Sequence, residues 1–69
     1  MLLENNGVTV LRFYKSATKD GAIGTLFIEL ASGEQRTVSA SDIGDVAMPF
    51  LRVFNPDTVN KGEFALEVL

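Results

Sequence analysis

Paired carboxylates are the first residues of this 69-residue sequence that could do chemistry. Asp42 and Asp45 lie three positions apart, a spacing that would place both side chains on one helix face, as a metal pair or an acid–base couple requires. Ser39 precedes Asp42 by the spacing typical of a helix start. Because negative charge stabilises the positive end of a helix, capping accounts for both aspartates, and we expect a structural role.

Serine is the conventional nucleophile to consider next, because the chain contains no cysteine. It contains no histidine either, so an attacking serine would lack its usual base. Ser16 follows Lys15, but adjacent residues of a strand point to opposite faces and cannot form a Ser–Lys pair. Gly21, Gly24 and Gly33 match no phosphate-binding spacing. We therefore expect no enzyme activity, no metal site and no cofactor.

The length indicates one small domain covering residues 1–69, and the strand patterns given below make it a β domain. A chain this short buries only about 60% of its unfolded surface, and this one has neither cysteines for disulfides nor the usual zinc ligands. Apolar residues make up 46% of the chain, so self-association is the remaining common way to bury more apolar area. The net charge of −3 gives no basic footprint and disfavours nucleic acid as the main partner.

The sequence carries no sign of a targeting or membrane segment. No stretch approaches the 18 apolar residues typical of a membrane span. Residues 1–4 lack the basic start of a signal peptide, and the absence of cysteine fits a reducing compartment. We therefore expect a cytoplasmic protein with no membrane partner.

The middle of the sequence predicts a β-hairpin of two strands, 23–31 and 35–40, joined by a tight turn at Ser32-Gly33. Apolar residues alternate with a period of two in the first of these strands, as a strand with one buried face requires. The positions predicted to be buried are Leu26, Ile28 and Leu30. The segment 29–43 resembles the strand–turn–strand segment of SH3-like modules.

Three further strands are predicted at 8–15, 49–54 and 63–69, and residues 1–6 are expected to be a lead-in with turn chemistry. In the last strand we expect Phe64, Leu66 and Val68 to face inward. One helical turn is expected within 41–48, because Pro49 forbids its continuation. The result is a mainly β fold: a small five-stranded antiparallel barrel or curved sheet, SH3-like or OB-like, with the helical turn between strands three and four.

Aromatic and arginine side chains gather on the predicted outward positions. If Leu11 and Phe13 are core residues, alternation turns their neighbours outward, and the same logic applies to the strands 23–31 and 49–54. The predicted partner-binding residues are Arg12, Tyr14, Phe27, Phe50, Arg52 and Phe54. Such a set exceeds what a soluble domain normally exposes. The alternative is a second small cluster covered by the loops 16–22 and 55–62.

Three functions are compatible with the sequence, two of them through this surface. Aromatic and arginine anchors at protein interfaces cost about 2–4 kcal/mol on truncation and need no excess positive charge, which favours a self-associating, non-enzymatic protein-interaction module. A small β-barrel that binds single-stranded nucleic acid is the first alternative, since stacking contributes roughly 1–3 kcal/mol per base, but it needs uncompensated cations. A small viral or mobile-element inhibitor of a host protein is the second alternative, based on size and acidity alone.

Overall fold

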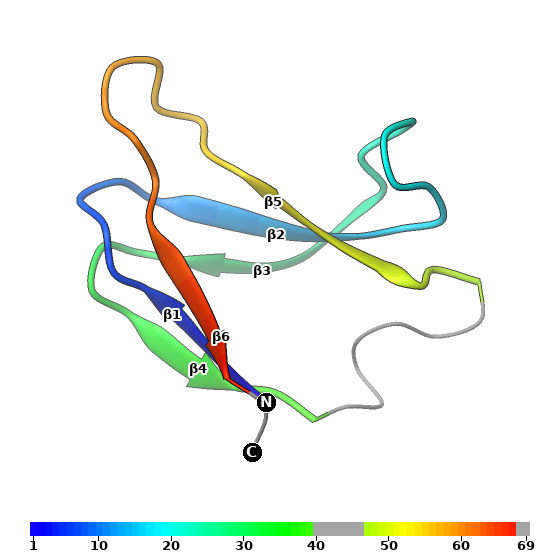
Figure 1. Ribbon diagram of the computed structural model, residues 1–69, viewed down its shortest axis with the longest axis horizontal. Helices are drawn as coiled ribbons and strands as arrows, with labels where there is room; N and C mark the ends of the chain where they lie inside the picture. The colour runs from blue at the N-terminus through cyan, green and yellow to red at the C-terminus, as the bar shows by residue number, and fades with distance from the viewer. Residues whose placement is uncertain (40–46, 68–69) are drawn as a thin grey trace.

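The computed structural model describes residues 1–39 and 47–67, which form six β-strands in two antiparallel sheets (Figure 1). The first sheet has the strand order β4-β1-β6, and the second has the order β3-β2-β5. The strands are β1 Leu2–Asn5, β2 Leu11–Ser16, β3 Thr25–Leu30, β4 Gln35–Thr37, β5 Phe50–Phe54 and β6 Phe64–Glu67. The predicted mainly β class is confirmed, and the residues described here contain no helix.

The strand count and the closure of the sheet differ from the expected five-stranded barrel. Residues 2–5, expected as a lead-in, form β1, which lies between β4 and β6 and is the central strand of its sheet. The described strands make two separate sheets and no closed barrel. The helical turn expected within 41–48 falls mainly on residues 41–46, which lie outside the described residues. In the part of the chain that the structure covers, no helix has the length and apolar character needed to cross a membrane.

The expected hairpin is wrong, because β3 pairs with β2 whereas β4 pairs with β1. A turn does form between them: the N–H of Glu34 donates to the carbonyl of Ala31 at 3.0 Å, and Gly33 has a φ of 77°. β4 pairs with β1 in place of β3. Asn5 donates its N–H to the carbonyl of Glu34 at 2.9 Å and accepts the N–H of Gly33 at 3.0 Å. The turn is therefore a corner between the sheets.

The side chain of Asn5 stabilises this corner from a buried position, since only 1% of the residue is exposed. Its Nδ2 donates to the carbonyls of Thr9 and Leu30 at 2.7 and 3.0 Å, and its Oδ1 accepts the N–H of Gly7 at 3.1 Å. One amide thus ties β1 to the end of β3 and to the loop after β1. A polar group is tolerated at this depth because its hydrogen bonds are made.

The apolar core lies between the sheets and is small. Its buried members among the described residues are Leu3, Leu11, Phe13, Ile28 and Leu30. Phe13 lies opposite Ile28 across the β2–β3 ladder, and Phe64 packs edge-on against the Phe13 ring with centroids 6.1 Å apart. So small a cluster leaves much of the apolar content of the chain outside the core.

A β-bulge in β3 changes which side chains face this core. Phe13 pairs with Ile28 but Tyr14 pairs with Leu26, so Phe27 is the extra residue. Leu26 therefore faces outward and is 52% exposed, whereas Phe27 packs against the core cluster. The expected core position of Leu26 and the expected outward position of Phe27 are both wrong.

Gly24 sets the start of β3. Its φ is 94°, and a Cβ at this position would collide with the backbone carbonyl of Lys15 on the neighbouring strand. Only glycine suits this combination of a positive φ and a close approach. The strand consequently begins at Thr25, later than the expected position 23.

Replacing Asn5 with alanine is expected to lower the free energy of unfolding by about 2–4 kcal/mol, because several buried backbone groups lose their partner at roughly 1–3 kcal/mol each. Asn6→Ala is the matched control, since that neighbouring side chain is exposed, and a change within about 0.5 kcal/mol is expected. Urea denaturation of both variants provides the measurement. Equal stabilities would contradict the role given to Asn5.

Candidate interaction surface

The face of the second sheet that points away from the core carries exposed apolar side chains. Arg12 lies opposite both Glu29 and Phe54, and Tyr14 lies between Leu26 and Arg52. Residues directly opposite in a ladder share a face. We call this surface the outer face; its members are Arg12, Tyr14, Leu26, Glu29, Phe50, Arg52 and Phe54. Leu26, Phe54 and Phe50 are 52%, 42% and 39% exposed.

Most of the residues predicted to bind a partner lie together on this outer face. They are Arg12, Tyr14, Phe50, Arg52 and Phe54. Phe27 is the exception, because the bulge turns it toward the core, where the Lys15 Nζ lies 5.7 Å from its ring centroid. Leu26 replaces it on the outer face. Alternation within a single strand could not reveal this exchange, because a bulge is defined by the register with a partner strand.

Both arginines of the outer face make contacts within the chain. The Nε of Arg12 lies 2.9 Å from a carboxylate oxygen of Glu29, and this hydrogen bond raises the pKa of the guanidinium. The Nη1 of Arg52 donates to the carbonyls of Gly21 and Ala22 at 2.7 and 2.9 Å. Arg52 therefore connects the loop between β2 and β3 to the sheet. Both arginines next to the apolar side chains of the outer face are thus already bound within the chain.

The outward side of the first sheet is polar by contrast. Glu4 lies opposite Gln35 on one neighbouring strand and opposite Ala65 on the other. The residues that share this side are Leu2, Glu4, Gln35, Thr37, Ala65 and Glu67. A sheet that faces water on one side normally has this composition. The exposed rings of the second sheet are therefore not a general property of the molecule.

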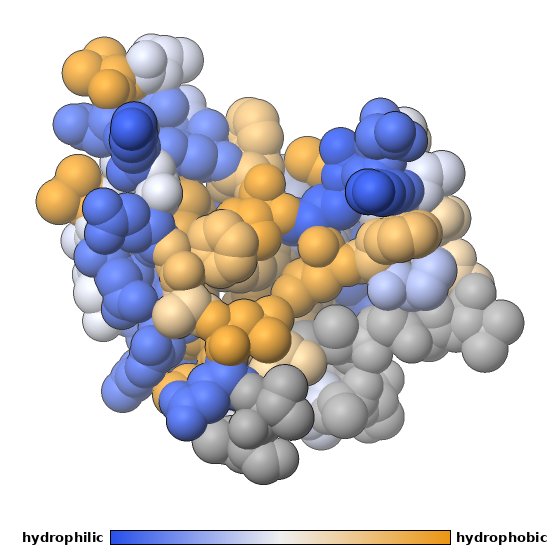
Figure 2. Space-filling view, viewed as in Figure 1, coloured by the Kyte–Doolittle hydropathy of each residue, from blue (hydrophilic) through white to orange (hydrophobic). Residues whose placement is uncertain are grey.

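The inner side of the first sheet is open at β6. Leu66 lies opposite the buried Leu3, so it faces inward as predicted, and so does Phe64; yet they are 45% and 51% exposed. Figure 1 shows β5 and β6 diverging from the loop 55–63 that joins them. Figure 2 shows apolar side chains gathered in a hollow between two hydrophilic margins. On this side the inward-facing residues of β6 are accessible to solvent, while the core cluster beneath them stays buried.

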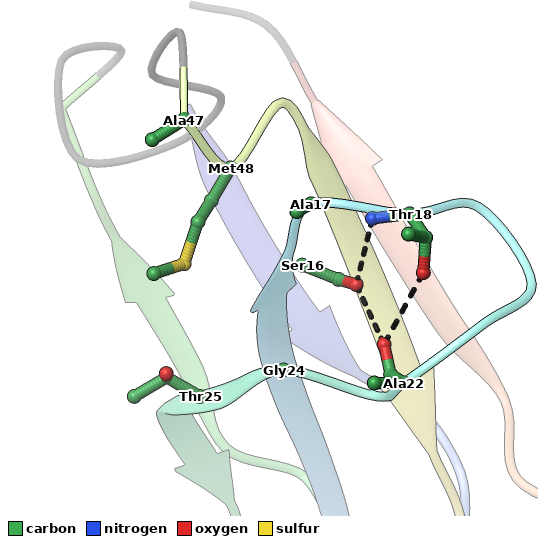
Figure 3. Close-up of a pocket in the computed structure, with 8 residues that line it drawn as sticks. All are labelled: Ser16, Ala17, Thr18, Ala22, Gly24, Thr25, Ala47 and Met48. Carbon is green, nitrogen blue, oxygen red and sulfur yellow. Dashed lines mark hydrogen bonds between the residues drawn. The ribbon is translucent and has the colours of Figure 1, made fainter.

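A second concavity, of about 220 Å³, lies where β2 runs into the following loop (Figure 3). Its lining residues are Ser16, Ala17, Thr18, Ala22, Gly24, Thr25, Ala47 and Met48. The Oγ of Ser16 donates to the carbonyl of Ala22 at 2.8 Å and accepts the N–H of Thr18 at 3.1 Å. This hydroxyl shapes the loop. The cavity is smaller than the roughly 300–1,000 Å³ typical of ligand sites.

Among the carboxylates, Asp57 has a clear structural role. No group of three or more acidic side chains suited to a metal ion occurs among the described residues, and Asp42 and Asp45 lie outside them. The Oδ1 of Asp57 accepts the N–H groups of Val59 and Asn60 at 2.7 and 3.0 Å. These hydrogen bonds lower the pKa of Asp57, so the carboxylate stays charged at neutral pH and orders its loop.

Comparison with known proteins assigns no family: no family model, curated protein or solved structure matches the chain. The functional inference therefore depends on the geometry described above.

The carboxyl of Asp57 is expected to titrate below its ordinary pKa of 3.8, because the N–H groups of Asn60 and Val59 stabilise the charged form. Since the folded pKa is the depressed one, the stability that this group contributes is complete above the unfolded pKa. It is lost as the pH falls through the folded pKa. NMR titration of the carboxyl provides the measurement, with the same group in the urea-unfolded chain as reference. Coincident midpoints would contradict the expectation.

Proposed function

We propose that this chain is a non-enzymatic protein-interaction module that self-associates through the second sheet. The observation that carries the proposal is the outer face, where Leu26, Phe50 and Phe54 are exposed together while the corresponding side of the first sheet is polar. The anchors are these three residues with Tyr14, Arg12 and Arg52 at their sides. The cysteine-free composition favours a module that works in the cytoplasm.

A second copy of the chain is the partner favoured by the size of the core. Only five described apolar residues are buried, and a chain without cysteine gains no stability from disulfides. Small domains of this kind commonly reach adequate burial by association. The anchors are therefore expected to contribute to the stability of the assembled fold as well as to recognition.

The exposed area sets the expected strength. An aromatic side chain offers roughly 200 Å² of surface, so the anchors expose on the order of 250–300 Å² of apolar area, the lower end of what marks a functional patch. Burying two such faces is worth about 12–15 kcal/mol by area, against an association cost of about 4–15 kcal/mol. A weak, concentration-dependent complex in the micromolar to millimolar range is the expected result.

The contacts of the arginines argue against nucleic acid as the partner. Arg36 lies 3.3 Å from Glu34, so each of the three arginines of the chain has a carboxylate or carbonyl partner within the chain. A phosphate backbone would have to displace these partners on a protein of net charge −3. Apolar contact with protein requires no such exchange.

Phe54→Ser is expected to weaken self-association by about tenfold or more, because truncating an interface anchor commonly costs about 2–4 kcal/mol and 1.4 kcal/mol is a factor of ten. Val59→Ser is the matched control: it also removes an exposed apolar side chain, one that is 87% exposed on a loop away from the sheet, and little change is expected. Sedimentation equilibrium over about 10 μM to 1 mM, a range that brackets weak complexes, provides the measurement.

Two results would overturn the proposed function. The first is a wild-type chain that stays monomeric throughout that concentration range. The second is tight binding to a single-stranded oligonucleotide with a steep salt dependence, which would establish the nucleic-acid alternative instead.

A further inference from the structure

β5 is the edge strand at which the two apolar surfaces of the molecule meet. It pairs with β2, and no other described strand lies on its second side. Phe50 and Phe54 belong to the outer face, while Leu51 and Val53 on the opposite side pack against the core cluster. A strand added to this edge would therefore extend both surfaces at once.

The other free edges of the described sheets carry features that oppose strand addition. β3 contains the bulge and Glu29. β4 has three residues, all polar and exposed, and β6 has four residues and ends at Glu67. Bulges, charges and shortness are the devices by which edges are normally protected.

The five residues of β5 contain no bulge and only one charge. Four of them are large and apolar, and Pro49 lies before the strand rather than within it. The single charge belongs to Arg52, whose guanidinium binds the carbonyls of Gly21 and Ala22. Ser16 of β2 donates to the same Ala22 carbonyl, so this carbonyl lies next to β2. The Arg52 guanidinium that binds it therefore points toward β2 and away from the free edge of β5.

The sequence of β5 is also self-complementary. Read in either direction it runs aromatic, aliphatic, arginine, aliphatic, aromatic. In an antiparallel pair centred on Arg52, Phe50 lies opposite Phe54 of a second copy, and Leu51 lies opposite Val53. Directly opposed aromatic and aliphatic pairs stabilise a sheet, whereas directly opposed like charges destabilise it. The two Arg52 side chains lie opposite each other in this register, but each guanidinium is bound to the carbonyls of Gly21 and Ala22 in its own chain.

We propose that two copies of this chain pair their β5 strands antiparallel about a two-fold axis at Arg52. The result is one six-stranded sheet with the order β3-β2-β5-β5-β2-β3. This inference rests on the proposed self-association and narrows the contact to the β5 edge, where Phe50, Arg52 and Phe54 meet the second copy and Leu26 on β3 does not. It pairs the free backbone of both edges and joins the two outer faces side by side. It also extends the inner side of the second sheet, which faces the same interior as the exposed Phe64 and Leu66 of β6.

The contact area agrees with a weak dimer. A pairing of two five-residue strands with partly buried side chains covers less than the roughly 1,200 Å² at which stable interfaces begin. Association through this edge is therefore expected only at high concentration, in the same range as the proposed function requires. An isologous contact of this kind closes on itself, so the assembly stops at two copies on this edge.

Arg52→Cys tests the position of the axis, and the chain has no other cysteine to interfere. Opposed residues of an antiparallel pair have Cα atoms about 4.5–5.5 Å apart, within the roughly 4.4–6.8 Å that a disulfide spans. Mild oxidation at associating concentrations is expected to give a covalent dimer as the main product on a non-reducing gel. Leu26→Cys is the matched control, because it lies on the same face but on the far strand, and it is expected to give no covalent dimer on the same gel.

The register is tested by mixing Phe50→Cys with Phe54→Cys. In either variant alone the two cysteines are offset by four residues along the strands, roughly 13 Å, which is too far for a disulfide. The mixture is expected to give the mixed covalent dimer, and each variant alone is expected to give little. If Arg52→Cys fails to fold because its contact with the loop is lost, this mixture alone tests the antiparallel pairing of the two β5 strands.

The outcomes separate the mode of pairing from the function. A covalent dimer through Leu26→Cys with none at Arg52→Cys or in the mixture would indicate packing of the outer faces against each other. That result overturns edge pairing and leaves self-association in place. A wild-type chain that never associates overturns both.

Discussion

The arrangement of the two sheets depends on the hydrogen bonds of Asn5. Its backbone N–H donates to the carbonyl of Glu34, and its backbone carbonyl accepts the N–H of Gly33. Its side-chain Nδ2 donates to the carbonyl of Leu30. A buried amide has to be satisfied fully, so these partners can be exchanged only at considerable cost. β1 is thereby fixed beside β4, and β3 is left to pair with β2 alone.

The open side of the core follows from that constraint. The sheets are joined at the corner between β3 and β4, and on the opposite side β5 and β6 diverge (Figure 1). Two three-stranded sheets that meet at one corner enclose only a small cluster, so Phe64 and Leu66 face inward yet remain half exposed. The exposed inner surface of β6 is thus a consequence of how few strands surround the core.

The sequence predicted the elements better than their pairing. Period-two alternation located β3, β5 and β6 to within a few residues, because such a pattern is local. β1 was not predicted because the segment Leu2–Asn5 is short and contains no β-branched residue, so no clear strand pattern is present there. The hairpin was mispredicted because a turn sequence fixes a change of direction and leaves the choice of partner strand open. The helical turn expected within 41–48 lies mainly outside the residues described.

The same distinction applies to the candidate surface. The side of the sheet on which the residues of β2 and β5 lie agrees with simple alternation, because these strands pair without interruption and Arg12 and Tyr14 lie opposite Phe54 and Arg52. Their role in binding a partner stays a prediction. Phe27 and Leu26 lie on the sides opposite to those expected, because the bulge arises from the register between two strands.

The pairing of β1 with β6, which places Leu3 opposite Leu66, has a kinetic consequence. During synthesis the earliest strand stays without its final neighbour until nearly the whole intervening chain has left the ribosome, so high contact order should make docking of the first sheet the slow step of folding.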